Sequence, residues 1–427
     1  MDNKLYNNYL EILKTELKPA MGCTEPIAIA LASAKCREVL GSMPTKITAI
    51  CSGNIIKNVK AVLVPNSNGQ KGVEVAAVLG AVAGDSSLGL EVISKASDKD
   101  AEKTRELVND GICTVKLKEG VDNLYIRIEE SNEDNSAVVE IVTKHDNITY
   151  IEKNGEVLHK QESILKKEAS TKNLLNLKDI YEFANTVKIS DVEDVIQKQI
   201  DYNTAISEEG LKGDWGESVG KTTLEIGDDS IRTKAIARAA AGSDARMNGC
   251  ALPVVINAGS GNQGMACTLP VFVYAEALKV NKEKLIRALI LTNLIAIHQK
   301  KYIGDLSAYC GAVSAGSAAG YGIAYLYDES FDVICDTLTN SLATNSGIVC
   351  DGAKSSCAAK IASSVNGAIL GYEMAKRGRH FRPGEGLVAN KCEDTVKNIG
   401  HIAKEGMKET DIEILNIMNK NIVKDEK

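Results

Sequence analysis

The sequence contains few aromatic residues and no cluster of basic residues. Phe, Trp and Tyr make up 4% of the 427 residues, and Trp215 is the single tryptophan. With so few large rings, the core has to be packed from Ala, Gly, Ile, Leu and Val, so we expect helices that approach one another closely. The 50 Lys and Arg residues are outnumbered by 57 Asp and Glu residues, which leaves no basic footprint for nucleic acid. We therefore expect no nucleic-acid partner.

Long apolar runs are also missing. The uncharged stretches 252–275 and 306–327 are long enough to be tested as membrane spans, but the first holds two prolines and several amides, and Gly, Ala and Ser dominate the second. Residues 1–18 are charged and amphipathic, without the apolar core of a signal peptide. The eleven cysteines form no dense regular framework, which is typical of a reducing compartment. We expect a cytoplasmic protein without a membrane partner.

Hydrophobic patterning predicts an α+β fold, a mostly helical catalytic domain with an inserted α+β sheet domain. Residues 1–41 and 185–427 are expected to form the helical domain, 42–165 the insertion, and 166–184 a linker and return helix. Within the insertion, 72–84 and 98–111 are expected to be helical. Alternation predicts strands over 46–53, 59–66, 88–93, 113–120, 124–131 and 137–145.

Turn and cap residues give further expectations. Asn154-Gly155 predicts a hairpin within 147–161. The first helix should end near Leu17, before Pro19, and a helix over 229–241 should end at Gly242. Two histidines of the insertion, His145 and His159, are interpreted as solvated or cross-strand residues because no second ligand is near them at helical or turn spacing.

Cys23 is expected just outside the N-terminus of a helix. Thr24, Glu25 and Pro26 form a strong helix start, and the apolar run that follows ends at Gly41. A thiol at such a position can have a lowered pKa, whereas an ionised Glu25 would oppose this. Glu25 could instead accept a proton or bind an ammonium group. A buried structural Cys beside a capping Glu stays open as the alternative.

Residues 259–264 satisfy the pattern G-x-G-x-x-G, yet we do not interpret them as a dinucleotide site. Pro270 interrupts the segment after the motif, and the next element, 281–301, is expected to be a helix, so the required βαβ unit is missing. A better hypothesis is a polar loop in which Asn257, Asn262 and Gln263 bind a small anion such as a carboxylate. A tight turn between buried helices is equally compatible.

Three cysteines, Cys310, Cys350 and Cys357, fall in nearly uncharged sequence. Residues 351–354 between the last two read as a turn, and Ser355-Ser356 as a helix cap, so Cys357 is expected in the first turn of a helix. The helix dipole favours a thiolate or an anionic iron-sulfur cluster there. Free Cys is also commonly a small buried apolar residue, so spacing alone leaves both interpretations open.

Five segments together resemble the L-cysteine desulfidase family, which is related to the iron-sulfur L-serine dehydratase alpha chain. They are GCTEP at 22–26, SDARMNGC at 243–250, NAGSGNQG at 257–264, YCGAVSAGSAAG at 309–320 and CDGAKSSCAAK at 350–360. The resemblance implies a [4Fe-4S] cluster ligated by Cys310, Cys350 and Cys357, with Cys23 as the catalytic base. If Cys23 is not the base, we expect the nearby Glu25 to act in its place. It transfers no role to Cys250. The cysteines that we interpret as structural or incidental are Cys36, Cys51, Cys113, Cys335 and Cys392.

The same resemblance implies a lyase of cysteine catabolism, which converts L-cysteine to hydrogen sulfide, pyruvate and ammonia. Three protein ligands would leave one iron open as a Lewis acid. L-serine as the substrate and a non-catalytic iron-sulfur redox sensor are the alternatives. Pyridoxal phosphate is the usual electron sink for such a reaction, but Lys354 and Lys360 have no phosphate-binding cup beside them. We expect a small amino acid as the partner, and a homo-oligomer stays open.

Overall fold

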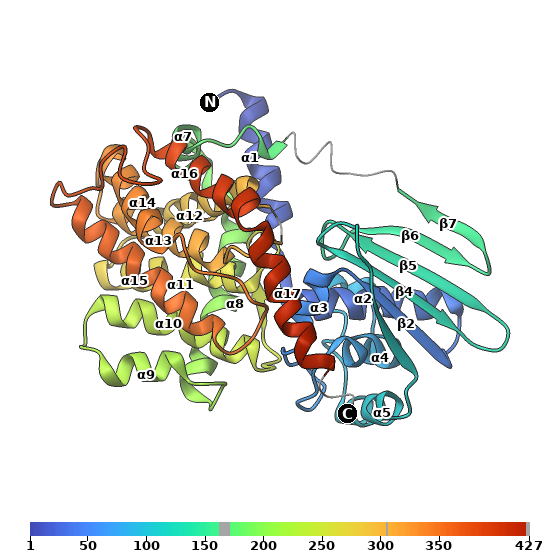
Figure 1. Ribbon diagram of the computed structural model, residues 1–427. Helices are drawn as coiled ribbons and strands as arrows, with labels where there is room; N and C mark the ends of the chain where they lie inside the picture. The colour runs from blue at the N-terminus through green and yellow to red at the C-terminus, as the bar shows by residue number, and fades with distance from the viewer. Residues whose placement is uncertain (162–170, 305, 424–427) are drawn as a thin grey trace.

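The computed structural model describes residues 1–161, 171–304 and 306–423. Two regions lie side by side, one made of helices and one built around a sheet (Figure 1). We call residues 19–160 the sheet region, and α1 together with residues 177–423 the helical region. The predicted α+β class is confirmed, because a mixed six-stranded sheet stands beside a mostly helical remainder.

The sheet region contains one mixed sheet with the strand order β3-β2-β4-β5-β6-β7. β2 and β3 are parallel, with Ile47 opposite Cys113, and all other neighbours are antiparallel. α2 packs on α4 and against β4 and β5, so these helices cover one face of the sheet. The elements are α2 (Thr24–Leu40), β2 (Lys46–Cys51), α3 (Gly53–Val59), α4 (Val73–Ala83), η1 (Ser86–Glu91), α5 (Asp98–Asn109), β3 (Cys113–Leu117), β4 (Tyr125–Ser131), β5 (Ser136–Val142), β6 (Ile148–Lys153) and β7 (Glu156–Lys160).

Most elements predicted for this region are confirmed. α4 and α5 occupy the two expected helical segments, and Asn154 and Gly155 join β6 to β7 with φ of 51° and 84°, as a tight hairpin requires. Two predicted strands were wrong. Residues 59–66 follow α3 as turns with an isolated bridge at Leu63, and residues 88–93 overlap the 3₁₀ helix η1, where Gly89 has a φ of 55°. Such short apolar runs fit a buried turn as well as a strand.

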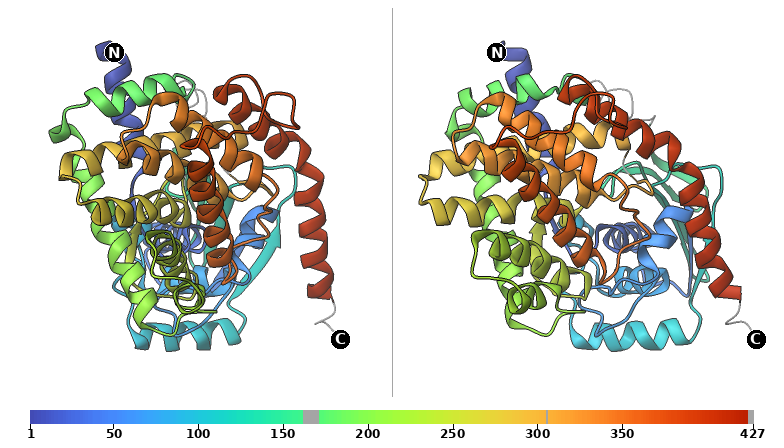
Figure 2. Two further views of the ribbon diagram at one scale, coloured as in Figure 1. Left: turned by 90° about the vertical axis from the view of Figure 1, so that its left-hand side faces the viewer. Right: turned by 60° about the vertical axis from the view of Figure 1, so that its left-hand side comes forward.

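The helical region is a bundle whose helices pack pairwise, α13 with α15 and α14, and α10 with α8 and α11 (Figure 2). No described helix is long and apolar enough to cross a membrane. Its elements are α1 (Asn3–Glu16), α7 (Leu177–Thr186), η2 (Ile189–Asp191), α8 (Glu193–Lys212), α9 (Val219–Ile226), α10 (Ile231–Met247), β8 (Pro253–Val255), α11 (Gly261–Leu278), α12 (Lys282–Ile303), α13 (Gly311–Leu326), α14 (Phe331–Asn345), α15 (Cys357–Ala375), α16 (Cys392–His401), η3 (Ile402–Gly406) and α17 (Lys408–Val423).

Close helix packing explains two boundaries that the sequence predicted wrongly. α10 does not end at Gly242 but runs on to Met247, because Gly242 makes room for α11, and a Cβ there would lie 2.5 Å from Met265 Sδ. Pro270 does not interrupt α11, which continues through it. The expected ends of the first two helices are confirmed, since α1 stops at Glu16 and α2 stops at Leu40 before Gly41 with a φ of 91°. Close small-residue packing is also confirmed, as Gly316 of α13 faces Ser364 of α15.

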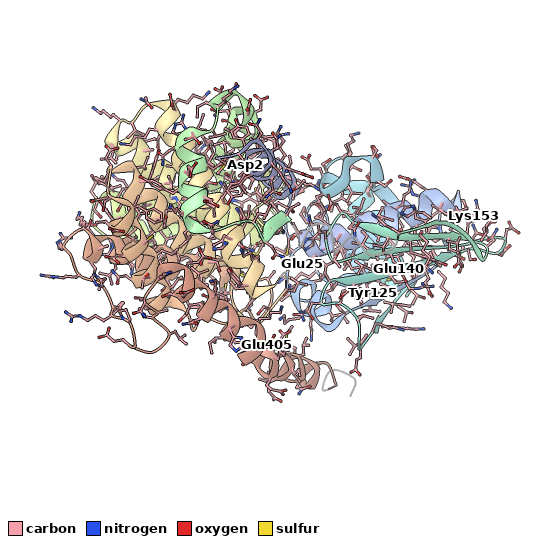
Figure 3. The ribbon with its side chains drawn as sticks, turned by 90° about the horizontal axis from the view of Figure 1, so that it is seen from above. Asp2, Glu25, Tyr125, Glu140, Lys153 and Glu405 are labelled. Carbon is pink, nitrogen blue, oxygen red and sulfur yellow. The ribbon has the colours of Figure 1, made fainter. Side chains whose placement is uncertain are left out.

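Paired strands and a helix connect the two regions. β1 (Pro19–Met21), which precedes α2, pairs antiparallel with β8 of the helical region. α17 runs along the outside of the junction, and Asp411 on it forms an ion pair with buried Lys57 of α3 at 2.5 Å (Figure 2). Seen from above, Glu25 at the start of α2 lies where the two regions meet (Figure 3). The division of the chain into domains stays a prediction, and the sequence did not indicate that α2 packs on the sheet.

Candidate active site

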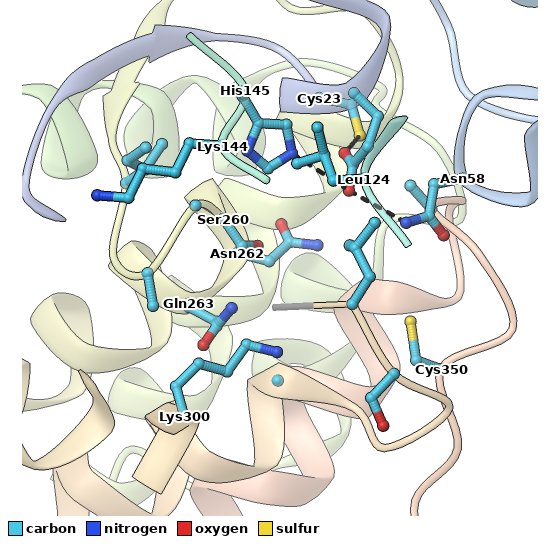
Figure 4. Close-up of a pocket in the computed structure, with 18 of the residues that line it drawn as sticks. Cys23, Asn58, Leu124, Lys144, His145, Ser260, Asn262, Gln263, Lys300 and Cys350 are labelled. Carbon is cyan, nitrogen blue, oxygen red and sulfur yellow. Dashed lines mark hydrogen bonds and ion pairs between the residues drawn. The ribbon is translucent and has the colours of Figure 1, made fainter. Parts of the chain in front are cut away.

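A cavity of about 140 Å³ lies at this junction. Cys23, Asn58 and His145 line it from the sheet side, and Asn262 and Gln263 from the helical side (Figure 4). Clefts for drug-sized ligands usually measure about 300 to 1,000 Å³. The cavity therefore suits a small metabolite.

The three proposed cluster ligands, Cys310, Cys350 and Cys357, all line this cavity. Cys310 precedes α13 and Cys357 begins α15, so the prediction of Cys357 in a first helical turn is confirmed. The N–H of Cys310 donates to the carbonyl of Ile348 at 3.1 Å, and the N–H of Cys350 donates to that of Ala308 at 2.6 Å. These reciprocal bonds hold the two cysteine-bearing loops side by side. Ser356 stands at the expected cap position, although its side chain makes no capping bond.

Three thiols that line one cavity are a donor set of the kind that an iron-sulfur cluster takes. Burial, followed by the neighbouring Cys350 and Cys357, raises the pKa of the Cys310 thiol to about 12, so the three sulfurs are close enough for their charges to repel. Within the described ranges, no three His, Cys, Asp or Glu side chains are placed to bind one ion. A cluster instead spreads its thiolate ligands over separate irons. The three thiols thus fit a cluster with three protein ligands.

Two lysines bring positive charge beside these thiols. Lys354 forms an ion pair with Asp351 at 2.6 Å, and Lys360 pairs with the same carboxylate. The Asp351 pKa is about 2, because its bonds to the two lysines outweigh burial. Both ammonium groups are therefore paired with the Asp351 carboxylate.

On the sheet side, Cys23 and Glu25 form a hydrogen-bonded pair. Gly22 has a φ of 55° and touches Pro65, which turns the chain into α2 directly after β1. Cys23 Sγ then donates to Glu25 Oε2 at 3.0 Å, and Asn58 Nδ2 donates to Glu25 Oε1 at 3.1 Å. His145 Nε2 lies 3.8 Å from the same Oε1, an ion-pair distance rather than a hydrogen bond. One buried carboxylate thus connects three neighbours.

In this pair the negative charge lies on Glu25 and not on Cys23, so Cys23 is not a thiolate. Burial and then the negative charge of Glu25 raise the Cys23 pKa well above its ordinary value, so the lowered pKa considered for Cys23 was wrong and the opposing effect of Glu25 is confirmed. Burial also acts to raise the Glu25 pKa, but the contacts with His145 and Cys23 outweigh it and hold that pKa at about 2. At rest the pair is a thiol and a carboxylate.

The three amides predicted in one polar loop occupy two elements, since Asn257 precedes α11 whereas Asn262 and Gln263 lie in its first turn. Asn262 and Gln263 line the cavity, where Asn262 Oδ1 and Gln263 Oε1 are buried without a hydrogen-bond donor. Asn257 is fully buried, and its Nδ2 donates to Oδ1 of Asn293 on α12 at 2.8 Å. Substrate binding by these amides stays a prediction. Residues 259–264 are followed by α11 and then α12, so this segment contains no βαβ unit. This order agrees with our not interpreting the segment as a dinucleotide-binding motif.

Three cavity residues were missed from the sequence. His145 was interpreted as solvated or cross-strand, but it is 8% exposed and lies against Gly259 of the polar loop. Nothing in its local sequence indicates this, because the contact depends on the docking of the two regions. Lys300 comes from the apolar helix α12 and gave no signal. Arg246 lies inside the segment SDARMNGC, and a charged residue in an otherwise small-residue helix end could have been noticed.

Comparisons with known proteins agree over nearly the whole chain. Residues 87–416 match the family model described as serine dehydratase alpha chain. A UPF0597 protein of Finegoldia magna is 54% identical, with 96% of this chain and 99% of the relative covered. UPF0597 proteins of Lachnoclostridium phytofermentans and Treponema denticola are 49% and 43% identical, with 97% and 99% of this chain covered and the whole of each relative. The chain therefore belongs to the serine dehydratase alpha chain family.

Proposed function

We propose that this chain is an iron-sulfur-dependent lyase that eliminates the β-substituent of a small L-amino acid. L-cysteine is the proposed substrate, and hydrogen sulfide, pyruvate and ammonia are the products. The observation that carries the proposal is that Cys23 and Glu25 line the same cavity as Cys310, Cys350 and Cys357. A proton acceptor and a three-thiol donor set thus face one space of small-metabolite size.

When bound by these three thiols, a [4Fe-4S] cluster supplies Lewis acidity at an iron with an open position. The chain's own contribution is proton transfer. Glu25 is the ionised member of its pair with Cys23, and the 3.0 Å contact lets the thiol proton pass to the carboxylate as Cys23 takes the α-proton of the substrate. The electrons of the Cα–H bond then form the Cα=Cβ bond as the Cβ–S bond breaks and sulfur leaves with its pair. The enamine hydrolyses to pyruvate and ammonia.

L-serine is the second candidate, and the description of the family model favours it. Both substrates share every step up to departure of the leaving group. Sulfide is the better leaving group, whereas hydroxide requires stronger acid assistance. Leaving-group ability therefore supports L-cysteine as the first candidate.

The test is a product assay under strict anaerobiosis on protein reconstituted with iron and sulfide. Pyruvate and sulfide from L-cysteine, and pyruvate from L-serine, are measured on the same preparation. We expect brown protein with a higher kcat/KM for L-cysteine. A clear preference for L-serine would overturn the substrate but not the elimination. Brown, inert protein would support a redox sensor, and yellow protein with Schiff-base absorbance would support pyridoxal phosphate.

A further inference from the structure

Arg246 is a buried guanidinium that no residue of the described chain neutralises. It occupies the last turn of α10, is 2% exposed and lines the cavity. Its Nε is buried without an acceptor, and in the described ranges its side chain forms no hydrogen bond or ion pair. By contrast, the buried Lys57 outside the cavity is paired with Asp411. A buried charge without a partner lowers the stability of the fold, so we expect a ligand to supply the counter-charge of Arg246.

The surroundings of Arg246 are arranged for a small anion. The guanidinium lies directly on Gly261, the first residue of α11, where a Cβ would come within 2.3 Å of Arg246 Nε and 2.8 Å of Cζ. The first N–H groups of a helix have no acceptor within it and favour negative charge. Beyond Gly261, the amides of Asn262 and Gln263 also reach the cavity. A cation, a helix N-terminus and two amides therefore converge on one place.

We propose that Arg246 binds the α-carboxylate of the substrate. The planar fork of a guanidinium matches a carboxylate with two parallel hydrogen bonds, which an ammonium group cannot reproduce. The inference rests on the proposed function only for the identity of the anion as that of an amino acid. Arg246 lines the same cavity as Cys23, Cys310 and Cys350, so a carboxylate held by Arg246 keeps the rest of the substrate in the space that these thiols face.

Two fragments of L-cysteine provide the test. 3-Mercaptopropionate keeps the thiol and the carboxylate, whereas cysteamine keeps the thiol and the amine but lacks the carboxylate. Binding of each to the full-length reconstituted protein is measured by calorimetry. We expect the wild type to prefer 3-mercaptopropionate, and Arg246→Met to weaken its binding by roughly 10- to 100-fold, the worth of a charge-assisted hydrogen bond, while cysteamine binding stays within about two-fold. Arg246→Lys should recover only part of the loss.

The matched control is Arg238→Met. Arg238 lies on the same helix and pairs with Glu208 at 3.4 Å, outside the cavity. This variant should keep the wild-type preference. Thermal unfolding separates binding from structure, since removal of an unpaired buried charge should leave the melting temperature of Arg246→Met unchanged or raised.

An unchanged preference in folded Arg246→Met would overturn the inference, as would a preference lost equally in Arg238→Met. A preference that depends on Arg246 in a protein that turns over neither L-cysteine nor L-serine would uphold carboxylate binding and reject the proposed lyase. Lyase activity with no dependence of the preference on Arg246 would do the reverse.

Discussion

Glu25 and Arg246 are buried ions on opposite walls of the cavity, and the chain treats them in opposite ways. On the sheet side, the Glu25 carboxylate accepts hydrogen bonds from Cys23 and Asn58 and faces His145. On the helical side, Arg246 has no partner among the described residues. Polar groups that act on a substrate are oriented by the protein beforehand, whereas groups that bind it gain their hydrogen-bond partners from it. The difference therefore indicates that Glu25 is preorganised and that Arg246 is completed by a ligand. The predictions below test whether the sheet wall transfers protons and the helical wall binds ligands.

The largest effect is expected from the cysteines of the helical wall. Replacing Cys310, Cys350 or Cys357 singly with Ala should remove most of the iron and all activity, since each thiol is one of the three proposed ligands. The fold should survive, because α13 and α15 pack on each other further along, where Gly316 and Gly320 lie against Ser364 and Ala368. Iron content by chelator assay and far-UV circular dichroism measure the two properties.

Cys267→Ala is the control for these variants. Cys267 is fully buried within α11 and does not line the cavity. Its replacement should keep the iron and the activity while costing about 1 kcal/mol of stability for a small cavity. Retention of iron in all three cavity variants would contradict the ligand assignment.

The next effect is expected from the preorganised pair of the sheet wall. Cys23→Ala should lower kcat by roughly 10² to 10⁴-fold, the usual contribution of a positioned base, while the visible absorbance of the cluster stays intact. Glu25→Gln should act in the same direction, because an amide cannot take up the proton of Cys23. Stopped assays of pyruvate with parallel spectra make the comparison. Undiminished turnover in Cys23→Ala would move the base to Glu25.

A smaller effect is expected from His145, which acts on the substrate only through Glu25. His145 lowers the Glu25 pKa, so His145→Gln should raise that pKa and move the acidic limb of the kcat/KM profile to higher pH, with a roughly ten-fold loss on that limb. His159→Gln on the exposed strand β7 is the control and should leave the profile unchanged. Equal profiles for both variants would mean that His145 only fills space.

Local sequence was sufficient where the structure has a local cause. Capping residues and hydrophobic periodicity predicted α1, α2, α4 and α5. Asn154-Gly155 predicted the hairpin, because these two residues themselves adopt the positive φ values that the turn requires. The errors at Gly242 and Pro270 arose because glycine and proline were interpreted as breaks. There, contacts between helices decide the structure, and these are not visible along one segment.

The candidate site was predictable only in part for the same reason. The three cysteines and the Cys23–Glu25 pair fall in compact motifs, so a resemblance could identify them. His145 reaches the cavity only after β5 has joined the sheet and the sheet region has docked on the loop around Gly259. The charge of Arg246 was visible in the sequence, but its lack of a partner is a property of the folded chain.

Glu130 offers a comparison with Glu25 away from the cavity. Glu25 is a buried carboxyl in the first turn of α2. Glu130 of β4 is a second buried carboxyl, which contacts Ser33 in the middle of the same helix. Ser33 Oγ lies 2.7 Å from the carbonyl of Ala77 and 2.6 Å from Glu130 Oε1. Since one hydroxyl has one hydrogen and the carbonyl can only accept, a protonated Glu130 that donates to Ser33 satisfies both contacts. Burial accordingly raises the Glu130 pKa to about 8.

The sign of the resulting pH dependence follows from this raised pKa. Below pH ~4.5 Glu130 is neutral in both the folded and the unfolded chain. As the pH rises toward 8 the unfolded chain loses this proton and the folded chain keeps it, so the contribution to stability falls by about 1.4 kcal/mol per pH unit and levels off above pH 8. Glu130→Gln keeps the bond to Ser33 without an ionisable group, so it should be the more stable protein at pH 8 and lose its advantage near pH 5, with kcat unchanged. Urea midpoints of both proteins across this range provide the measurement. Midpoints that stay parallel would mean that Glu130 is ionised in the folded protein, and burial alone would then not separate it from Glu25.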